Sequence, residues 1–259
     1  MLRLNLQCAA LLTGLFMATS GQAASVIRFG VDPSYPPFEQ KLPDGSLSGF
    51  DIDLGNALCA QIKVRCVWVE QNFDGMIPAL KAQKFDGILS AFSDTEARRK
   101  QVDFSQRLYV APSSLIAKKG SGLLPTATSL KGKSVGVVQG SLQESYAKSE
   151  WASSGTIVHS YQTQDQVFMD LISGRLDGSF QASVQGDIGL LQKDQGKDFA
   201  FAGDPITDKS IIGNGVAVGI RKNDTALRDT INAAIVALRQ SGEYDRIAKK
   251  YFAYDVYGE

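Results

Sequence analysis

The sequence predicts an α/β protein with two lobes, each a mostly parallel sheet flanked by helices. Short apolar segments alternate with segments of helical spacing from residue 26 to residue 251, and this alternation is typical of parallel strands joined by helices. The length of 259 residues allows more than one domain, at about 150 residues each. Two further segments, 111–115 and 204–213, lead from one alternating block to another and back. We therefore expect a discontinuous first lobe that is joined twice to the second, the layout of a protein that closes at a hinge.

The apolar pattern predicts the elements of each lobe in order. Helix 54–62 carries Leu54, Leu58 and Ile62 on one face, and Asp51 near its start suits the helix dipole. The first lobe, 24–110 and 213–259, is expected to hold strands 26–31, 64–70, 87–89 and 215–220 and helices 54–62, 76–83, 95–101, 226–241 and 243–251. The second lobe, 114–206, is expected to hold strands 134–138, 157–160 and 178–181 and helices from about 142 and over 164–173. The hinge crossings are expected at 111–113 and 207–212.

Residues 1–23 have the pattern of a cleaved signal peptide, which predicts export to the periplasm. Arg3 precedes an apolar run, and Gly21 and Ala23 supply the small residues of a cleavage site. The run is shorter than the about 20 residues that span a membrane. An uncleaved N-terminal anchor is the alternative.

Charge and cysteine content exclude several classes of protein. Lys and Arg together number 27, as do Asp and Glu, so there is no basic excess of the kind that a general nucleic-acid binder needs. Cys59 and Cys66 are expected to form a disulfide in an oxidising compartment. A metal site is a poor alternative because His159 is distant and two thiolates do not complete a zinc site. We expect no metal and no cofactor.

Five motifs occur in one order along the chain and resemble the family 3 periplasmic solute-binding proteins. They are DPSYPPF at 32–38, GFDIDL at 49–54, LSAFS at 89–93 followed by Arg98, VGVVQGS at 135–141 and KKYFAYDVYG at 249–258. The resemblance is strongest to the lysine/arginine/ornithine- and histidine-binding subgroup, whose members carry the same short-loop disulfide. It implies the two-lobed fold of type II periplasmic binding proteins and a monomer that captures a cationic amino acid by cleft closure. It also implies an inner-membrane ABC permease as partner and no enzymatic activity.

The resemblance implies that Arg98 and Ser93 bind the α-carboxylate of the ligand. Arginine offers a planar fork of donors that matches a carboxylate, although a solvated arginine in the run 98–100 is the alternative. The strand-to-helix turn of the second lobe is implied to bind the same carboxylate. Its residues are Val138, Gly140, Ser141 and Leu142, where relatives have Thr in place of Leu142.

Four residues of the first lobe are implied to bind the cationic end of the ligand. Asp32 would pair with its charge, Tyr35 and Phe73 would enclose its stem, and Ser90 would add a polar contact. A carboxylate and two ring faces suit a cation. A capping aspartate and two core aromatics are the alternative interpretation.

Ala182 and Ala91 depart from the family pattern. Relatives place an aspartate at Ala182 to bind the α-ammonium of the ligand, and a serine at Ala91. Three explanations remain open: another group such as Gln181 or Ser183 replaces the aspartate, free amino acids bind weakly, or the ligand nitrogen carries a substituent. The last would fit an opine such as octopine or nopaline.

An enzyme of the same fold, such as a periplasmic dehydratase, is a further alternative. It would need a general acid in the cleft, and Asp32 is already assigned to a cation. His159 is interpreted as structural, and Asp51 and Asp53 as residues of a helix start rather than an acid/base pair.

Overall fold

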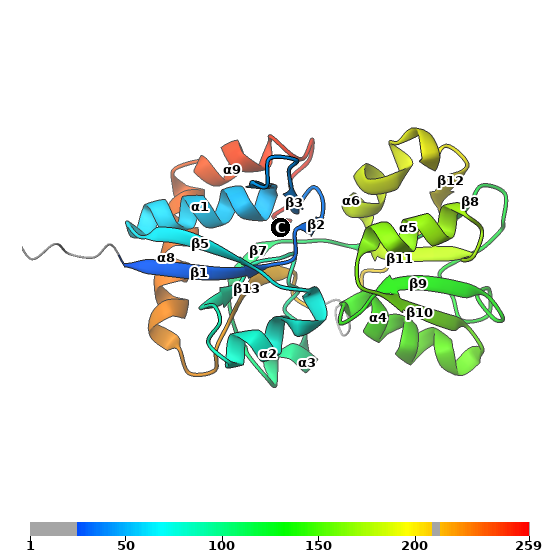
Figure 1. The fold of residues 1–259 in the computed structure, drawn as a ribbon, viewed down its shortest axis with the longest axis horizontal. Helices are drawn as coiled ribbons and strands as arrows, with labels where there is room; N and C mark the ends of the chain where they lie inside the picture. The colour runs from blue at the N-terminus through cyan, green and yellow to red at the C-terminus, as the bar shows by residue number, and fades with distance from the viewer. Residues whose placement is uncertain (1–24, 209–212, 259) are drawn as a thin grey trace, which may run out of the picture.

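The computed structural model describes residues 25–208 and 213–258, which form two lobes around separate sheets (Figure 1). The expected signal peptide at 1–23 and part of the expected crossing at 207–212 lie outside the described residues. No helix among the residues described is long and apolar enough to cross a membrane.

The sheet of the first lobe has the strand order β5-β1-β6-β13-β7. Its strands are β1 (Val26–Val31), β5 (Arg65–Glu70), β6 (Gly87–Ile88), β7 (Asp103–Tyr109) and β13 (Val216–Ile220). A small sheet at its edge comprises β2 (Ser34–Tyr35), β3 (Glu39–Lys41) and β4 (Leu47–Ser48). The helices are α1 (Phe50–Ile62), η1 (Phe73–Gly75), α2 (Met76–Lys81), α3 (Glu96–Arg99), α8 (Thr225–Gln240) and α9 (Glu243–Ala248).

The sheet of the second lobe has the order β10-β9-β11-β8-β12. Its strands are β8 (Ser113–Lys118), β9 (Ser134–Val138), β10 (Ile157–Tyr161), β11 (Gly178–Ala182) and β12 (Phe199–Phe201). Its helices are α4 (Leu142–Tyr146), η2 (Ala147–Trp151), η3 (Ala152–Ser154), α5 (Gln164–Ile172), α6 (Ser183–Gly186), η4 (Asp187–Leu191) and η5 (Asp194–Gly196).

Both sheets are mixed, with one strand reversed in each. In the first lobe β13 runs against β6 and β7, and in the second lobe β8 runs against β11 and β12. The other four strands of each sheet share one direction. The reversed strands are those that first enter a lobe after a crossing, so no crossover helix of their own lobe sets their direction. Strands β7, β8 and β12 were not predicted from the sequence.

The two crossings meet where the second lobe begins. Ser113, the first residue of β8, pairs with Ile206, and the Ile206 N–H donates to the Ser113 carbonyl oxygen at 2.7 Å. The outgoing and returning chains therefore run side by side at this point.

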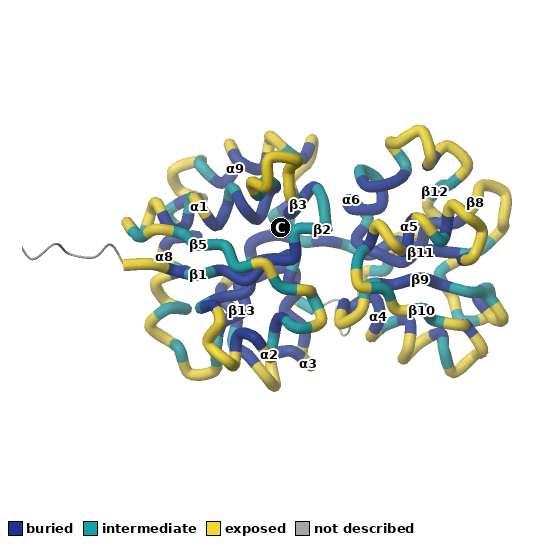
Figure 2. Tube along the Cα trace, in the orientation of Figure 1, coloured by how far each residue is buried: buried dark blue, intermediate teal, exposed yellow. Residues whose placement is uncertain are grey.

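Helices cover both faces of each sheet, as the alternation predicted. The inner strands such as β11 and β13 are buried, whereas the edge strands β5, β10 and β12 are partly exposed (Figure 2). In the first lobe, one apolar cluster lies under α1, α8 and α9 and a second under α2. The predicted disulfide joins Cys59 of α1 to Cys66 of β5. A bridge that closes so short a loop stabilises a fold by about 2–3 kcal/mol on the loop-entropy model.

Candidate ligand-binding site

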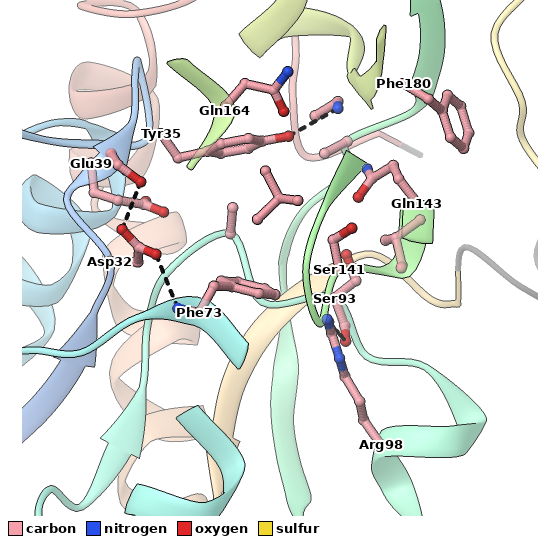
Figure 3. Close-up of a pocket in the computed structure, with 16 residues that line it drawn as sticks. Asp32, Tyr35, Glu39, Phe73, Ser93, Arg98, Ser141, Gln143, Gln164 and Phe180 are labelled. Carbon is pink, nitrogen blue, oxygen red and sulfur yellow. Dashed lines mark hydrogen bonds between the residues drawn. The ribbon is translucent and has the colours of Figure 1, made fainter. Parts of the chain in front are cut away.

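A pocket lies between the lobes and receives side chains from both (Figure 3). The predicted site residues that line it are Asp32, Tyr35, Phe73, Ala91, Ser93 and Arg98 from the first lobe and Val138, Ser141, Leu142 and Ala182 from the second. Ser34, Glu39, Ala111, Gln143, Gln164 and Phe180 complete the lining and were not predicted. Most of these residues lie at or just beyond the carboxyl ends of strands, the edge where α/β sheets bind ligands.

Arg98 brings a buried positive charge to one end of the pocket. It belongs to α3 and is 8% exposed. Its guanidinium donates to the Ser93 carbonyl oxygen at 2.9 Å and to the Gly140 carbonyl oxygen at 3.1 Å, and it lies over the ring of Phe92. Burial lowers the pKa of Arg98 to about 10, so it remains charged at neutral pH.

No carboxylate of the described residues forms an ion pair with Arg98, whereas its neighbour Arg99 pairs with Asp94. A buried cation with only carbonyl partners retains donors for an anion. The interpretation of Arg98 as a solvated residue of a charged run therefore does not hold.

Two buried carboxylates, Asp32 and Glu39, lie at the end of the pocket away from Arg98 (Figure 3). Asp32 accepts hydrogen bonds from Ser34 Oγ at 2.7 Å and from the Phe73 N–H at 3.0 Å, and burial raises its pKa. Glu39 is 1% exposed, its carboxyl lies next to that of Asp51, and its Oε2 has no hydrogen-bond donor among the described residues. Burial, and then the nearby charge of Asp51, raise the pKa of Glu39 well above its usual value. A cationic ligand group would stabilise the ionised form of both carboxyls.

Glu39 follows directly on the DPSYPPF motif, and an acidic residue beside a buried apolar segment was the available signal. Ser90 lies behind the two acids rather than on the pocket surface. Its hydroxyl accepts from the Asp32 N–H and donates to Glu39 Oε1, both at 3.0 Å. Ser90 thus positions the carboxylates.

The two acidic residues of helix α1, Asp51 and Asp53, form hydrogen bonds within the fold. Asp51 accepts from Tyr109 Oη at 2.8 Å and from the Ala91 N–H at 2.6 Å, which holds the loop that carries Ala91. Asp53 accepts from Lys250 Nζ at 2.9 Å. His159 contacts Ser134 Oγ at 3.2 Å and does not line the pocket.

Comparison with known proteins identifies this architecture. The model of the bacterial extracellular solute-binding proteins, family 3, matches residues 27–254. The chain belongs to this family.

Individual relatives span nearly the whole chain. The lysine/arginine/ornithine-binding periplasmic protein of Escherichia coli is 49% identical over 96% of this chain and 97% of its own length. The L-arginine-binding protein of Pseudomonas aeruginosa is 47% identical over 90% of each. A solved Salmonella typhimurium periplasmic binding protein with high arginine specificity has a TM-score of 0.81 at 31% identity, covering 89% of this chain and 100% of that one. All three are named as binding proteins, not as enzymes.

In this solute-binding protein the two lobes touch across the pocket. The Ala182 N–H donates to Tyr35 Oη at 2.9 Å, and Arg98 reaches the carbonyl oxygen of Gly140. Gly140 lies in the turn between β9 and α4 with a φ of 75°, and a Cβ there would lie 2.8 Å from Asp74 Cα of the first lobe. Glycine therefore permits this close approach.

We expect Gly140→Ala to weaken ligand binding by about tenfold or more, because the added methyl group must push the lobes apart. A tenfold loss of affinity corresponds to only about 1.4 kcal/mol of binding free energy. Gly174→Ala is the matched control, since Gly174 has a φ of 76° and open space around its Cβ position. Both variants carry the same backbone strain. Calorimetric affinity and small-angle scattering with and without ligand measure the effect, and equal affinities of the two variants would contradict it.

Proposed function

We propose that this solute-binding protein captures, in the periplasm, an amino acid with a cationic side chain, of the arginine, ornithine, lysine or histidine type, or an N-substituted derivative. The supporting observation is the charge arrangement of the pocket: the buried guanidinium of Arg98, which has no ion-pair partner among the described residues, and two buried carboxylates, Asp32 and Glu39. A ligand with a carboxylate at one end and a cation at the other complements both charges.

The aromatic residues suit the stem of such a ligand. Tyr35 and Phe73 line the pocket between the charged ends (Figure 3). Ring faces pack against methylene groups and attract cations, which contributes about 0.5–2 kcal/mol per contact. A long cationic side chain gains more from these rings than a short one.

Contacts from both lobes explain why binding would favour closure. Arg98 and Asp32 belong to the first lobe, and Ser141 and Gln143 belong to the second. A ligand that touches both sets has higher affinity for the closed form than for an open one. The closed form then presents the ligand to an inner-membrane ABC permease, and we propose that the protein acts as a monomer after removal of residues 1–23.

The relatives support a cationic amino acid, since their names specify lysine, arginine, ornithine and histidine. They do not favour the opine or the dehydratase alternative. Ala182 nevertheless makes an N-substituted derivative worth including in the test.

The test is a panel of arginine, ornithine, lysine, histidine, octopine and nopaline, with glutamate as an anionic control. We expect cationic amino acids to raise the melting temperature and to bind with measurable heat, whereas glutamate does neither because its side chain would meet Asp32 and Glu39. A protein that responds to no cationic member, or equally to glutamate, would refute the proposal.

A further inference from the structure

The second-lobe wall of the pocket holds one acceptor that lacks a donor. This wall carries no carboxylate among the residues described, since its lining residues are Val138, Ser141, Leu142, Gln143, Gln164, Phe180 and Ala182. Gln164, the first residue of α5, is 1% exposed, and no described residue donates a hydrogen bond to its Oε1. An unpaired buried acceptor is costly, so a donor from the ligand would relieve it.

Neighbouring side chains fix the orientation of the Gln164 amide. Its Nε2 donates to Ser179 Oγ at 3.1 Å and lies 3.5 Å from Gln181 Oε1. The Ser179 hydroxyl in turn donates a hydrogen bond to Gln181 Oε1. Turning the amide over would place Gln164 Oε1 and Gln181 Oε1 against the single Ser179 hydroxyl proton, which can serve only one of them. The network therefore leaves Oε1 free on the pocket side, where Gln164 reaches toward the hydroxyl end of Tyr35 (Figure 3).

Gln181 and Ser183, the two replacements that the sequence suggested for the missing aspartate, already form hydrogen bonds within the protein. Gln181 Nε2 donates to the Ser114 carbonyl oxygen at 3.0 Å, and its Oε1 accepts from Ser179. Ser183 Oγ lies 2.6 Å from Ser114 Oγ and donates to the Pro112 carbonyl oxygen at 3.0 Å. Neither residue lines the pocket.

We propose that Gln164 Oε1 accepts a hydrogen bond from the α-ammonium group of the ligand. It would replace the carboxylate that the side chain of Ala182 lacks. The inference rests on the proposed function, because it requires an α-amino acid in the pocket. The Ala182 N–H already binds Tyr35, and its methyl group offers no acceptor. A neutral amide binds an ammonium less strongly than a carboxylate does, so the α-amino group should contribute only a moderate share of the affinity.

The test compares arginine with 5-guanidinopentanoate, the same molecule without the α-amino group, by calorimetry. The wild-type protein should prefer arginine by roughly tenfold to hundredfold, the range of one hydrogen bond to a charged group. Gln164→Leu should remove this preference by weakening arginine alone. Retained binding of 5-guanidinopentanoate shows that the variant is folded.

Two further variants sharpen the comparison. Gln192→Leu removes a second-lobe amide outside this pocket, whose Nε2 donates to Asp187 Oδ2 at 2.8 Å, and should leave both affinities unchanged. Ala182→Asp in the Gln164→Leu background should restore the preference for arginine.

The outcomes separate this inference from the proposed function. If Gln164→Leu weakens both ligands equally or neither, or if the wild-type protein does not prefer arginine over 5-guanidinopentanoate, Gln164 is not the acceptor. If the wild-type protein binds neither these ligands nor another cationic amino acid, the proposed function itself fails.

Discussion

Arg98→Ala should reduce the affinity for every ligand with an α-carboxylate by roughly 10²- to 10⁴-fold, since two hydrogen bonds to a charged group contribute about 1.5–3 kcal/mol each. The side chain is buried at the pocket and pairs with no carboxylate of the described residues, so donors remain available to the ligand. Removing an unpaired buried cation should not lower the free energy of unfolding of the ligand-free protein by a comparable amount. Calorimetric titration and thermal unfolding measure the two quantities separately.

Two neighbouring substitutions serve as controls for Arg98. Arg99→Ala removes the adjacent guanidinium, which is 53% exposed and paired with Asp94, and should leave the affinity unchanged. Arg98→Lys keeps the charge but loses the planar fork, so an intermediate affinity is expected. Equal affinities of Arg98→Ala and the wild-type protein would show that the ligand carboxylate is bound elsewhere.

Asp32→Asn should weaken cationic ligands by roughly tenfold to hundredfold, because one charged hydrogen-bonding partner is lost while Glu39 remains. The asparagine oxygen can still accept from the Phe73 N–H, and the Ser34 hydroxyl can turn to accept from the new amide, so the local structure should persist. The loss should be smaller for a ligand with a neutral side chain, such as norleucine. Calorimetry with arginine and norleucine measures this difference.

Asp44→Asn is the matched control for Asp32, since Asp44 bonds only to Ser46 on an exposed turn and should not affect binding. If Asp32→Asn weakens arginine and norleucine equally, the carboxylate supports the pocket without pairing with the cation.

The residues that follow predicted strands could be placed from the sequence. Asp32 follows β1, Phe73 lies beyond β5, and Arg98 lies on α3, the helix that follows β6. Because the carboxyl ends of parallel strands meet at one edge, motifs at these points converge on one site. Local pattern and the family resemblance together were therefore sufficient to place Asp32 and Arg98 at the pocket, but not Glu39.

The order of the chain also predicted both lobes, the helices on each sheet face and the bridge between Cys59 and Cys66. It did not predict strands β7, β8 and β12 or the reversal of β8 and β13, since strand direction there depends on pairing with distant strands.

Only the tertiary structure decided which polar groups are satisfied and which are left for a ligand. Glu39 meets Ser90, 51 residues away, yet retains an unpaired oxygen. Gln164 is oriented by Ser179, 15 residues later in the chain. The sequence by itself determined that Asp32 and Arg98 lie at the edge where the strands end, because their positions follow from local elements. The acceptors along its walls depend on burial and hydrogen bonding between distant segments, and these exist only once the lobes have folded and met.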